Sequence, residues 1–319
     1  MIKMVSNPKL KSPIMICAWP GMGEVAIRTA LYLKKQLGFR ELARMTPADY
    51  FELPGVVVHN AVLNSPSPGG GIFYYYKDPA RRRDIILCIA GAQPIAGKSI
   101  PYATEIIKFA QRFGVQMILS FAALSTPIDH TQTPGVWIAA SNRKLLDGFK
   151  GLGVKMLKDG QISGMNGLIL GVAKRHGIDG ACLLGEIPLY AIQIENPKAS
   201  YAILEVLSKY LLIRFDLASL DERAKIMEDE IHKLIGYLKG EPQESQPLSE
   251  DEVERLKLDL ADYSKLPESA RKKIEELFMQ AGLDIGKAND LKKELDTWHV
   301  FDEYQDRFLD LFRNKRANQ

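Results

Sequence analysis

Short runs of apolar residues alternate with segments of helical spacing through the first two thirds of the chain. The run at residues 14–18 ends in Trp-Pro-Gly-Met-Gly, and residues 24–36 behind it have helical composition and spacing, which predicts a strand, a tight loop and a helix. Further strands are predicted at residues 56–63, 71–76, 84–90, 115–121, 136–140 and 181–184, and further helices at residues 101–113, 142–149, 166–176 and 197–215. Strands that alternate with helices of this length indicate an α/β fold with a mostly parallel sheet that is covered on both faces.

One pair of these strands predicts an antiparallel element, so the sheet is expected to be mixed. Residues 56–63 and 71–76 flank the segment Ser-Pro-Ser-Pro-Gly-Gly-Gly, which is rich in turn-forming residues. We therefore expect the two strands to form a hairpin with each other.

The pattern changes after residue 197. Capping-box residues at 219–222 start a helix whose apolar positions recur every three or four residues: Leu220, Ala224, Met227, Ile231, Leu234 and Leu238. This seam could join two copies of the chain, or it could lie on its own domain. Residues 240–247 are polar and contain two prolines, which is typical of a linker. Amphipathic helices are predicted beyond it at residues 248–262, 268–281 and 287–313. We expect an α/β domain over residues 1–240 and an acidic, helical C-terminal region over 241–319.

Charge separates the same two regions. The net charge is +3, but residues 241–319 hold 13 basic and 19 acidic residues, a charge of −6, which leaves +9 on residues 1–240. Aromatic residues do not interleave with the basic ones, so nucleic-acid binding is not expected. The sequence has no run of about 18 apolar residues, so no membrane span is expected. The three cysteines lie in apolar runs, where we expect buried, reduced thiols. Together these features lead us to expect a cytoplasmic protein.

The string Gly-Ala-Gln-Pro-Ile-Ala-Gly-Lys-Ser at residues 91–99 resembles a phosphate-binding loop after a strand. A working loop needs glycines that turn successive backbone N–H groups toward the phosphates. Here Ala92 replaces the first glycine and Pro94 removes an N–H donor. We therefore expect that Lys98 does not bind a nucleotide, and no cofactor is predicted.

Sets of residues for catalysis or metal binding are not evident. The five histidines have no metal-ligand spacing with one another or with the cysteines, so no metal is predicted. Asp129 and His130 follow Ser125 and Thr126, but adjacent residues of one loop rarely form a catalytic triad. We interpret that stretch as a polar loop, and we predict no catalytic residues.

Several short motifs follow one another within residues 12–215: Trp-Pro-Gly-Met-Gly at 19–23, the three glycines at 69–71, Gly-Ala-Gln-Pro at 91–94, Ser-Gly-Met-Asn-Gly-Leu at 163–168 and Gly185-Glu186. In their order and spacing they resemble the proteasome assembly chaperone 2 family. The resemblance implies a three-layer α/β/α fold similar to nucleoside phosphorylases and hydrolases, and chaperone members that bind proteasome α-subunits. Archaeal chaperones of this kind can end in a hydrophobic residue, a tyrosine and any residue, whereas the sequence here ends in Arg-Ala-Asn-Gln.

Ligands of open α/β sheets bind at the carboxyl ends of the strands. We expect five segments to meet there and to line one pocket: residues 19–24, 91–93, 121–123, 163–167 and 185–186. Glycines at helix starts would offer backbone N–H groups to an anion, and glutamates would accept bonds from hydroxyls. The alternative is that the glycines only allow tight turns and the glutamates cap helices or face solvent. The candidate pocket residues are Trp19, Gly21, Gly23, Glu24, Gln93, Ser163, Gly164, Asn166, Gly167 and Glu186.

Two functions follow from these observations. The first is a chaperone-like, homo-oligomeric scaffold that binds proteins, with proteasome subunits among the expected partners. The second is an enzyme or ligand-binding protein whose phosphorylase-like pocket takes a nucleoside- or phosphate-containing small molecule. The sequence favours the first, because it shows no acid/base pair, metal site or activated nucleophile.

Overall fold

The structure is a computed structural model of the chain, and it describes residues 2–46, 50–51, 57–59, 61–64, 70–80, 82–238, 268–283, 285–297, 301, 304–305, 307–309 and 311. The chain divides into two compact units, one of residues 1–187 and 191–243 and one of residues 188–190 and 244–319. The predicted linker at 240–247 and the predicted helix at 248–262 lie outside the described residues.

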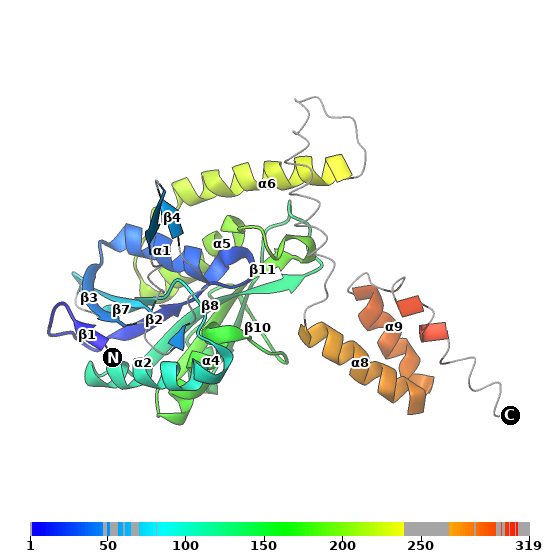
Figure 1. Ribbon diagram of the computed structural model, residues 1–319, viewed down its shortest axis with the longest axis horizontal. Coiled ribbons are helices and arrows are strands. Elements are labelled where there is room, and N and C mark those ends of the chain that lie inside the picture. The colour runs from blue at the N-terminus through cyan, green and yellow to red at the C-terminus, as the bar shows by residue number, and fades with distance from the viewer. Residues whose placement is uncertain are drawn as a thin grey trace. The chain divides into compact units, whose positions relative to one another are not determined.

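The first unit is an α/β fold built on a nine-stranded sheet (Figure 1). In chain order its strands are β1 (Ile2–Met4), β2 (Ile14–Ala18), β3 (Arg40–Met45), β6 (Ile72–Tyr76), β7 (Ile85–Ile89), β8 (Met117–Thr126), β9 (Val136–Ala140), β10 (Val154–Met156) and β11 (Asp179–Pro188). Its helices are α1 (Val25–Leu37), α2 (Ser99–Arg112), α3 (Arg143–Asp147), α4 (Gly164–Arg175), α5 (Pro197–Leu211) and α6 (Ala218–Leu238).

Parallel pairs occur at the centre of the sheet and at its β10 edge, where β9 and β10 run in parallel, and the strands at the β1 edge are antiparallel. The strand order is β1-β3-β6-β7-β2-β8-β11-β9-β10. Strand β2 pairs in parallel with β7 and β8, whereas β6 is antiparallel to both β3 and β7, and β11 is antiparallel to β9. The sheet is therefore mixed, as expected.

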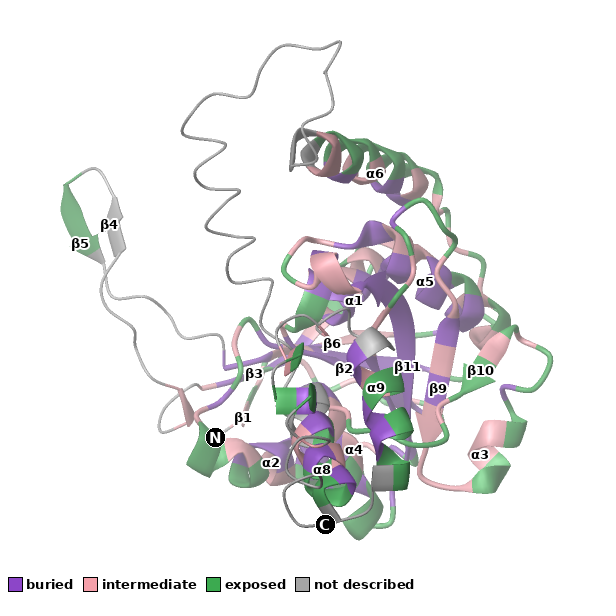
Figure 2. Ribbon diagram, turned by 90° about the vertical axis from the view of Figure 1, so that its right-hand side faces the viewer, coloured by how far each residue is buried: buried purple, intermediate pink, exposed green. Residues whose placement is uncertain are grey.

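Helices cover both faces of this sheet, because its central strands are apolar on both faces. Every residue of β2 is buried. Ile14, Ile16 and Ala18 belong to the core on the side of α1 and α5, and Met15 and Cys17 belong to the core on the side of α2 and α4. Figure 1 shows these helix pairs on opposite sides of the sheet, and Figure 2 shows the buried length of β11 between them. The predicted three-layer α/β/α class is confirmed.

The predicted hairpin between residues 56–63 and 71–76 is wrong. The first segment folds back on itself as β4 (Val57–His59) and β5 (Val62–Asn64), an antiparallel pair that forms a sheet of its own. Strand β6 pairs instead with β7 and with β3. Strand β3 was not predicted, because its sequence Arg-Glu-Leu-Ala-Arg-Met has no continuous apolar run.

The apolar seam of α6 packs on its own unit. Leu220, Ala224 and Ile231 are buried, and α6 lies along α5. The side chains of Leu234 and Leu238 lie outside the described residues. Of the two interpretations that the sequence left open for this seam, the described part fits a helix that lies on its own domain.

The second unit contains α8 (Glu268–Leu283) and α9 (Ala288–Thr297). Its core includes Ile274, Phe278, Leu291 and Leu295. Helix α8 coincides with the helix predicted at residues 268–281.

Candidate functional site

Three chain segments meet where the parallel strands end, and polar side chains hold them together. They are the segment after β2, the segment after β7 and the start of α4. The parallel directions of β2 and β7 bring the first two segments to the same end of the sheet. Of the predicted site residues, Trp19, Gln93, Gly164 and Asn166 lie together here through the contacts described below.

Asn166 joins the start of α4 to the end of β2. Its side-chain oxygen accepts a hydrogen bond from the backbone N–H of Trp19 at 2.9 Å, and its side-chain NH₂ donates to the backbone carbonyl of Trp19 at 3.0 Å. The carbonyl of Asn166 in turn accepts a bond from the hydroxyl of Ser120 on β8, at 2.7 Å. Asn166 is 5% exposed and Trp19 is fully buried, so these groups depend on one another rather than on water.

Gln93 repeats this arrangement at the surface. Its side-chain NH₂ donates to the carbonyl of Pro20 at 2.7 Å, and its oxygen accepts from the backbone N–H of Met165 at 2.9 Å. This second bond occupies one of the N–H groups at the start of α4 that an anion would otherwise use. Gly164 has φ of +69° and would place a Cβ 3.1 Å from the Gln93 nitrogen, so glycine suits this position in both conformation and size.

Gly167 is required by the tight turn into α4. A Cβ at this position would overlap the carbonyl oxygen of Ile162. Ser163, the residue before α4, is exposed, and its side chain makes no capping hydrogen bond. Close packing therefore accounts for Gly167, in agreement with the alternative that this glycine allows a tight turn.

Gly21, Gly23 and Glu24 form the loop between β2 and α1. Gly21 is exposed, and Gly23 and Glu24 both have positive φ, at +58° and +50°. The N–H of Gly23 donates to the carbonyl of Ile192, and its carbonyl accepts from the N–H of Asn196. Glu24 pairs with Arg28 at 2.7 Å. The loop is thus fixed to the segment that precedes α5.

Among the described residues, no hydrogen bond links the Glu186 side chain to Trp19, Gln93 or Asn166. One of its oxygens accepts from the backbone N–H of Gly135, and the other from the indole N–H of Trp137, both at 2.7 Å. Lys155 lies 3.6 Å from the second oxygen. Glu186 is 6% exposed, so both of its oxygens serve to hold the start of β9 against β11.

Sequence reasoning missed two buried partners of this site, Ser120 and Tyr102. The Tyr102 hydroxyl accepts a bond from the indole N–H of Trp19 at 3.3 Å and donates to the carbonyl of Gly70 at 2.9 Å. Burial, reinforced by the nearby Cys88, raises the pKa of Tyr102 well above its usual range. Tyr102 lies in an apolar helical stripe, so its sequence context indicated only a core residue.

The other sequence candidates are placed as follows. The backbone N–H of Lys98 donates to the carbonyl of Ile95 in a helical turn before α2. This N–H is therefore occupied by the protein's own backbone, whereas a phosphate-binding loop directs such groups toward the phosphate. His130 is buried with its ring 3.3 Å from Asp129, and the backbone carbonyl of His130 accepts from Lys198. Within the residues that the structure describes, no three potential ligands gather around a metal position, and no helix is long and apolar enough to cross a membrane.

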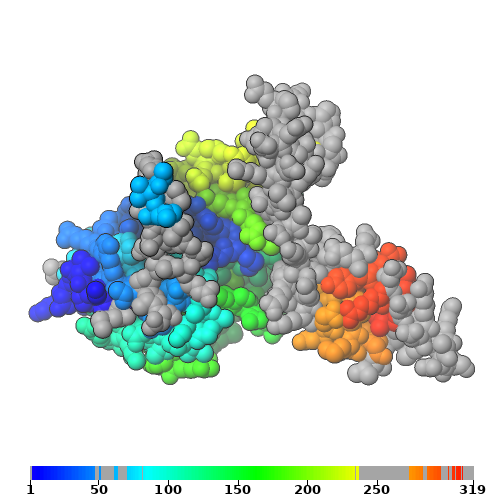
Figure 3. All heavy atoms as spheres, viewed as in Figure 1, coloured from blue at the N-terminus to red at the C-terminus, as the bar shows by residue number. Residues whose placement is uncertain are grey.

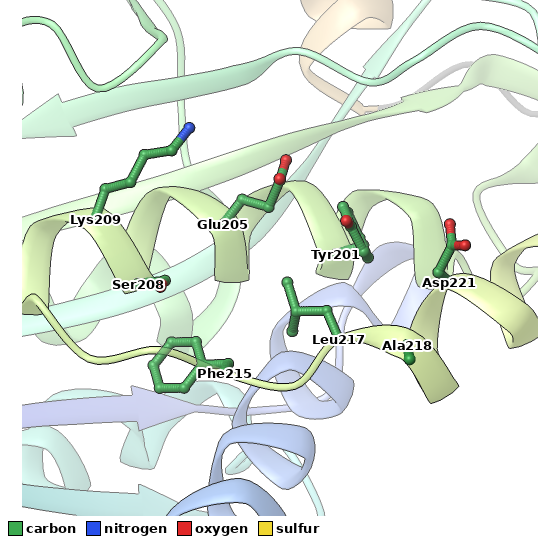
Figure 4. A pocket seen from close by; sticks show the side chains of 8 residues that line it. All are labelled: Tyr201, Glu205, Ser208, Lys209, Phe215, Leu217, Ala218 and Asp221. Carbon is green, nitrogen blue, oxygen red and sulfur yellow. The ribbon is translucent and has the colours of Figure 1, made fainter.

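A cavity of about 390 Å³ lies away from the strand ends, between α5 and the segment that leads into α6 (Figure 4). The Ser208 hydroxyl donates to the carbonyl of Ile213 beside it, and Asp221 pairs with Lys225 at 2.7 Å. Burial, with the carboxylates of Glu205 and Asp221, raises the pKa of Tyr201. None of the predicted site residues lines this cavity, which is formed by Tyr201, Glu205, Ser208, Lys209, Phe215, Leu217, Ala218 and Asp221.

Comparison with known proteins identifies one family and several relatives. The model of the PAC2 family matches residues 15–235. An uncharacterized protein of Methanocaldococcus jannaschii is 27% identical over 247 residues, which are 73% of this chain and 89% of that protein.

Two solved structures from Pyrococcus furiosus share both fold and sequence with the chain. PbaB, described as an archaeal proteasome activator, is 28% identical with a TM-score of 0.64, over 73% of this chain and 98% of PbaB. PbaA, described as an archaeal homolog of proteasome-assembly chaperone, is 25% identical with a TM-score of 0.56, over 73% of this chain and 96% of PbaA.

Proposed function

The chain belongs to the PAC2 family, and from this premise we propose that it is a homo-oligomeric scaffold that binds proteins and engages subunits of the proteasome. The two domains that carry this role are the α/β domain of residues 1–240 and the acidic helical region of residues 241–319. We place its action in the cytoplasm.

The pairing of polar groups at the strand ends is the observation that supports a scaffold over an enzyme. An enzyme of this architecture would hold its substrate there with free donors and acceptors. Here the side-chain oxygen and NH₂ of Asn166 both bond to the backbone of Trp19, and those of Gln93 bond to the backbone of Met165 and Pro20. The two oxygens of Glu186 are bound as well. These groups brace the fold.

The class of partner is inferred from the relatives. PbaB and PbaA are both described by their relation to the proteasome, and the chain spans almost the whole length of each. A scaffold that shares their fold and about a quarter of their residues is suited to the same kind of partner. The charge of −6 on residues 241–319 adds an acidic region that can select basic surfaces on that partner.

Native mass spectrometry of the protein purified without added ligand tests the scaffold itself. We expect an oligomer that carries no bound small molecule. A retained mass of nucleoside or phosphate size would instead support the alternative, a ligand-binding protein or enzyme with a phosphorylase-like pocket. A monomer would contradict the homo-oligomeric part of the proposal.

Mixing the protein with proteasome α-subunits, and separately with the assembled core particle, tests the partner. We expect co-elution with one of the two in size-exclusion chromatography at physiological salt, and none with an unrelated protein of similar net charge. Equal retention of the unrelated protein, or co-elution with neither form of the proteasome, would contradict the proposed partner.

A further inference from the structure

One wall of the cavity beside α5 is polar. Lys209, Glu205 and Tyr201 lie at successive turns of α5, because four residues separate each from the next. Figure 4 shows them in this order, with Asp221 of α6 beyond Tyr201. An ammonium group therefore stands at one end of the wall, and two carboxylates stand toward the other end with Tyr201 between them.

Two of these charges are not used by the protein itself. In the part of the chain that the structure describes, the side chains of Glu205 and Lys209 form no ion pair and no hydrogen bond. A glutamate followed four residues later by a lysine on a helix commonly pairs with it, but here the two groups stay apart. Asp221 differs, because Lys225 pairs with it at 2.7 Å. The open charges are thus one carboxylate and one ammonium group, one helical turn apart.

The balance of charge around the cavity selects the kind of ligand. The carboxylates of Glu205 and Asp221 are matched by the ammonium groups of Lys209 and Lys225. A ligand with a net negative charge would meet two carboxylates, and a simple cation would meet two ammonium groups, so a ligand that carries one charge of each sign fits best. Burial, and then the two carboxylates, raise the pKa of Tyr201, so the field at its hydroxyl favours the cationic group.

The opposite wall is apolar and can hold a hydrocarbon group. It includes the half-buried side chains of Phe215 and Leu217, together with Ala218. The Ser208 hydroxyl between the walls is already bonded to the carbonyl of Ile213. The volume of about 390 Å³ lies within the range of roughly 300–1,000 Å³ that is usual for small-molecule sites.

We propose that this cavity binds a free α-amino acid with an apolar side chain, its ammonium group at Glu205, its carboxylate at Lys209 and its side chain against Phe215 and Leu217. Helix α6 lies at the surface of the first unit (Figure 3), and Glu205 and Lys209 are exposed, so a ligand reaches the cavity from solvent. Exposed ion pairs are weak, and we expect a dissociation constant on the order of 1 mM. A ligand held this weakly is lost during purification. The scaffold function does not depend on this site.

The test is a titration of the full-length protein with L-leucine, followed by saturation-transfer difference NMR. We expect saturable binding below about 20 mM. Leucinamide lacks the carboxylate and N-acetyl-leucine lacks the ammonium group, so each should bind at least about threefold more weakly than L-leucine. Equal affinity for the three compounds, or no saturable binding of L-leucine, would overturn the inference while the scaffold function stands.

Two variants assign the binding to this cavity. Glu205→Gln and Lys209→Met each remove one charge at an exposed position, and each should weaken the binding of L-leucine at least about threefold. The matched controls are Glu105→Gln and Lys108→Met, which remove the same charges from an exposed pair on α2 and should leave the affinity unchanged. An affinity that neither cavity variant changes would overturn the inference.

The Glu205→Gln variant also tests the orientation of the ligand. Without the carboxylate that faces the ammonium group, L-leucine and N-acetyl-leucine should bind with similar affinity. A difference between the two compounds that persists in this variant, with folding confirmed by circular dichroism, would contradict the assignment of the ammonium group to Glu205.

Discussion

Replacing Asn166 by alanine tests whether the strand-end amides stabilise the fold as their burial indicates. The change deletes both hydrogen bonds to Trp19 and leaves its backbone N–H and carbonyl buried without these partners. A buried polar group that loses its partner costs about 1–3 kcal/mol, so two groups should lower the free energy of unfolding by about 2–6 kcal/mol. Urea denaturation at a fixed protein concentration, followed by circular dichroism, measures the loss.

Gln93→Ala is the matched comparison, because it removes the same chemical group and the same number of backbone hydrogen bonds. Gln93 is exposed, so water can replace its amide at Pro20 and Met165. We expect a loss of about 1 kcal/mol or less. Equal losses for the two variants, or a loss below about 1 kcal/mol for Asn166→Ala, would refute the view that burial sets the importance of this contact.

Three further predictions concern other parts of the first unit. In α4, Gly167→Ala should destabilise the protein by several kcal/mol, because the added Cβ overlaps a neighbouring carbonyl oxygen. Gly171→Ala adds a Cβ with nothing within 4 Å and should stabilise the protein by about 0.5–1 kcal/mol. Urea denaturation measures both changes, and equal effects would contradict the steric argument. Burial alone would raise the pKa of Asp78, but hydrogen bonds from Arg82 and from backbone N–H groups outweigh it and lower that pKa. The folded pKa of Asp78 therefore lies below the unfolded value of about 3.9. The stabilisation by the ionised carboxylate is complete above about pH 3.9 and is lost as the pH falls through the folded pKa. Asp78→Asn should thus reduce the acid sensitivity of unfolding measured between pH 6 and pH 3. Burial raises the pKa of Cys182 to about 12, so its thiol should resist iodoacetamide at pH 8 in the native protein and react in urea. Peptide mass mapping measures the labelling. Rapid labelling of Cys182 in the native protein would contradict the burial of this strand.

The central strands could be predicted from the sequence because they are buried on both faces. Strands such as β2 and β7 are short continuous apolar runs, and their predicted bounds lie within about one residue of the observed ones. Strand β3 escaped prediction because exposed arginines interrupt its apolar positions. The partner of β6 could not be predicted either, since strand pairing depends on residues far apart in the chain, and the turn-rich segment before β6 indicated a local hairpin instead.

The candidate site was predictable in its position and not in its bonding. Parallel strands bring their carboxyl ends to one edge, which is why Trp19, Gln93 and Asn166 could be grouped from sequence order alone. The sequence could not show that their polar groups face one another, because an amide next to a helix start fits a ligand contact as well as a backbone contact. Glu186 was assigned to the same group, but its oxygens bind Gly135 and Trp137.

Two backbone hydrogen bonds at Gly23 have a dynamic consequence. They join the loop before α1 to the segment before α5, from the N–H of Gly23 to Ile192 and from the N–H of Asn196 to Gly23, and the Ser200 hydroxyl adds a third bond to the carbonyl of Val25. Segments that share their amide partners in this way open together, as a single cooperative unit. The amides of Gly23 and Asn196 should therefore be protected from exchange with solvent to closely similar degrees, once their intrinsic exchange rates are taken into account, although more than half the chain separates them in sequence.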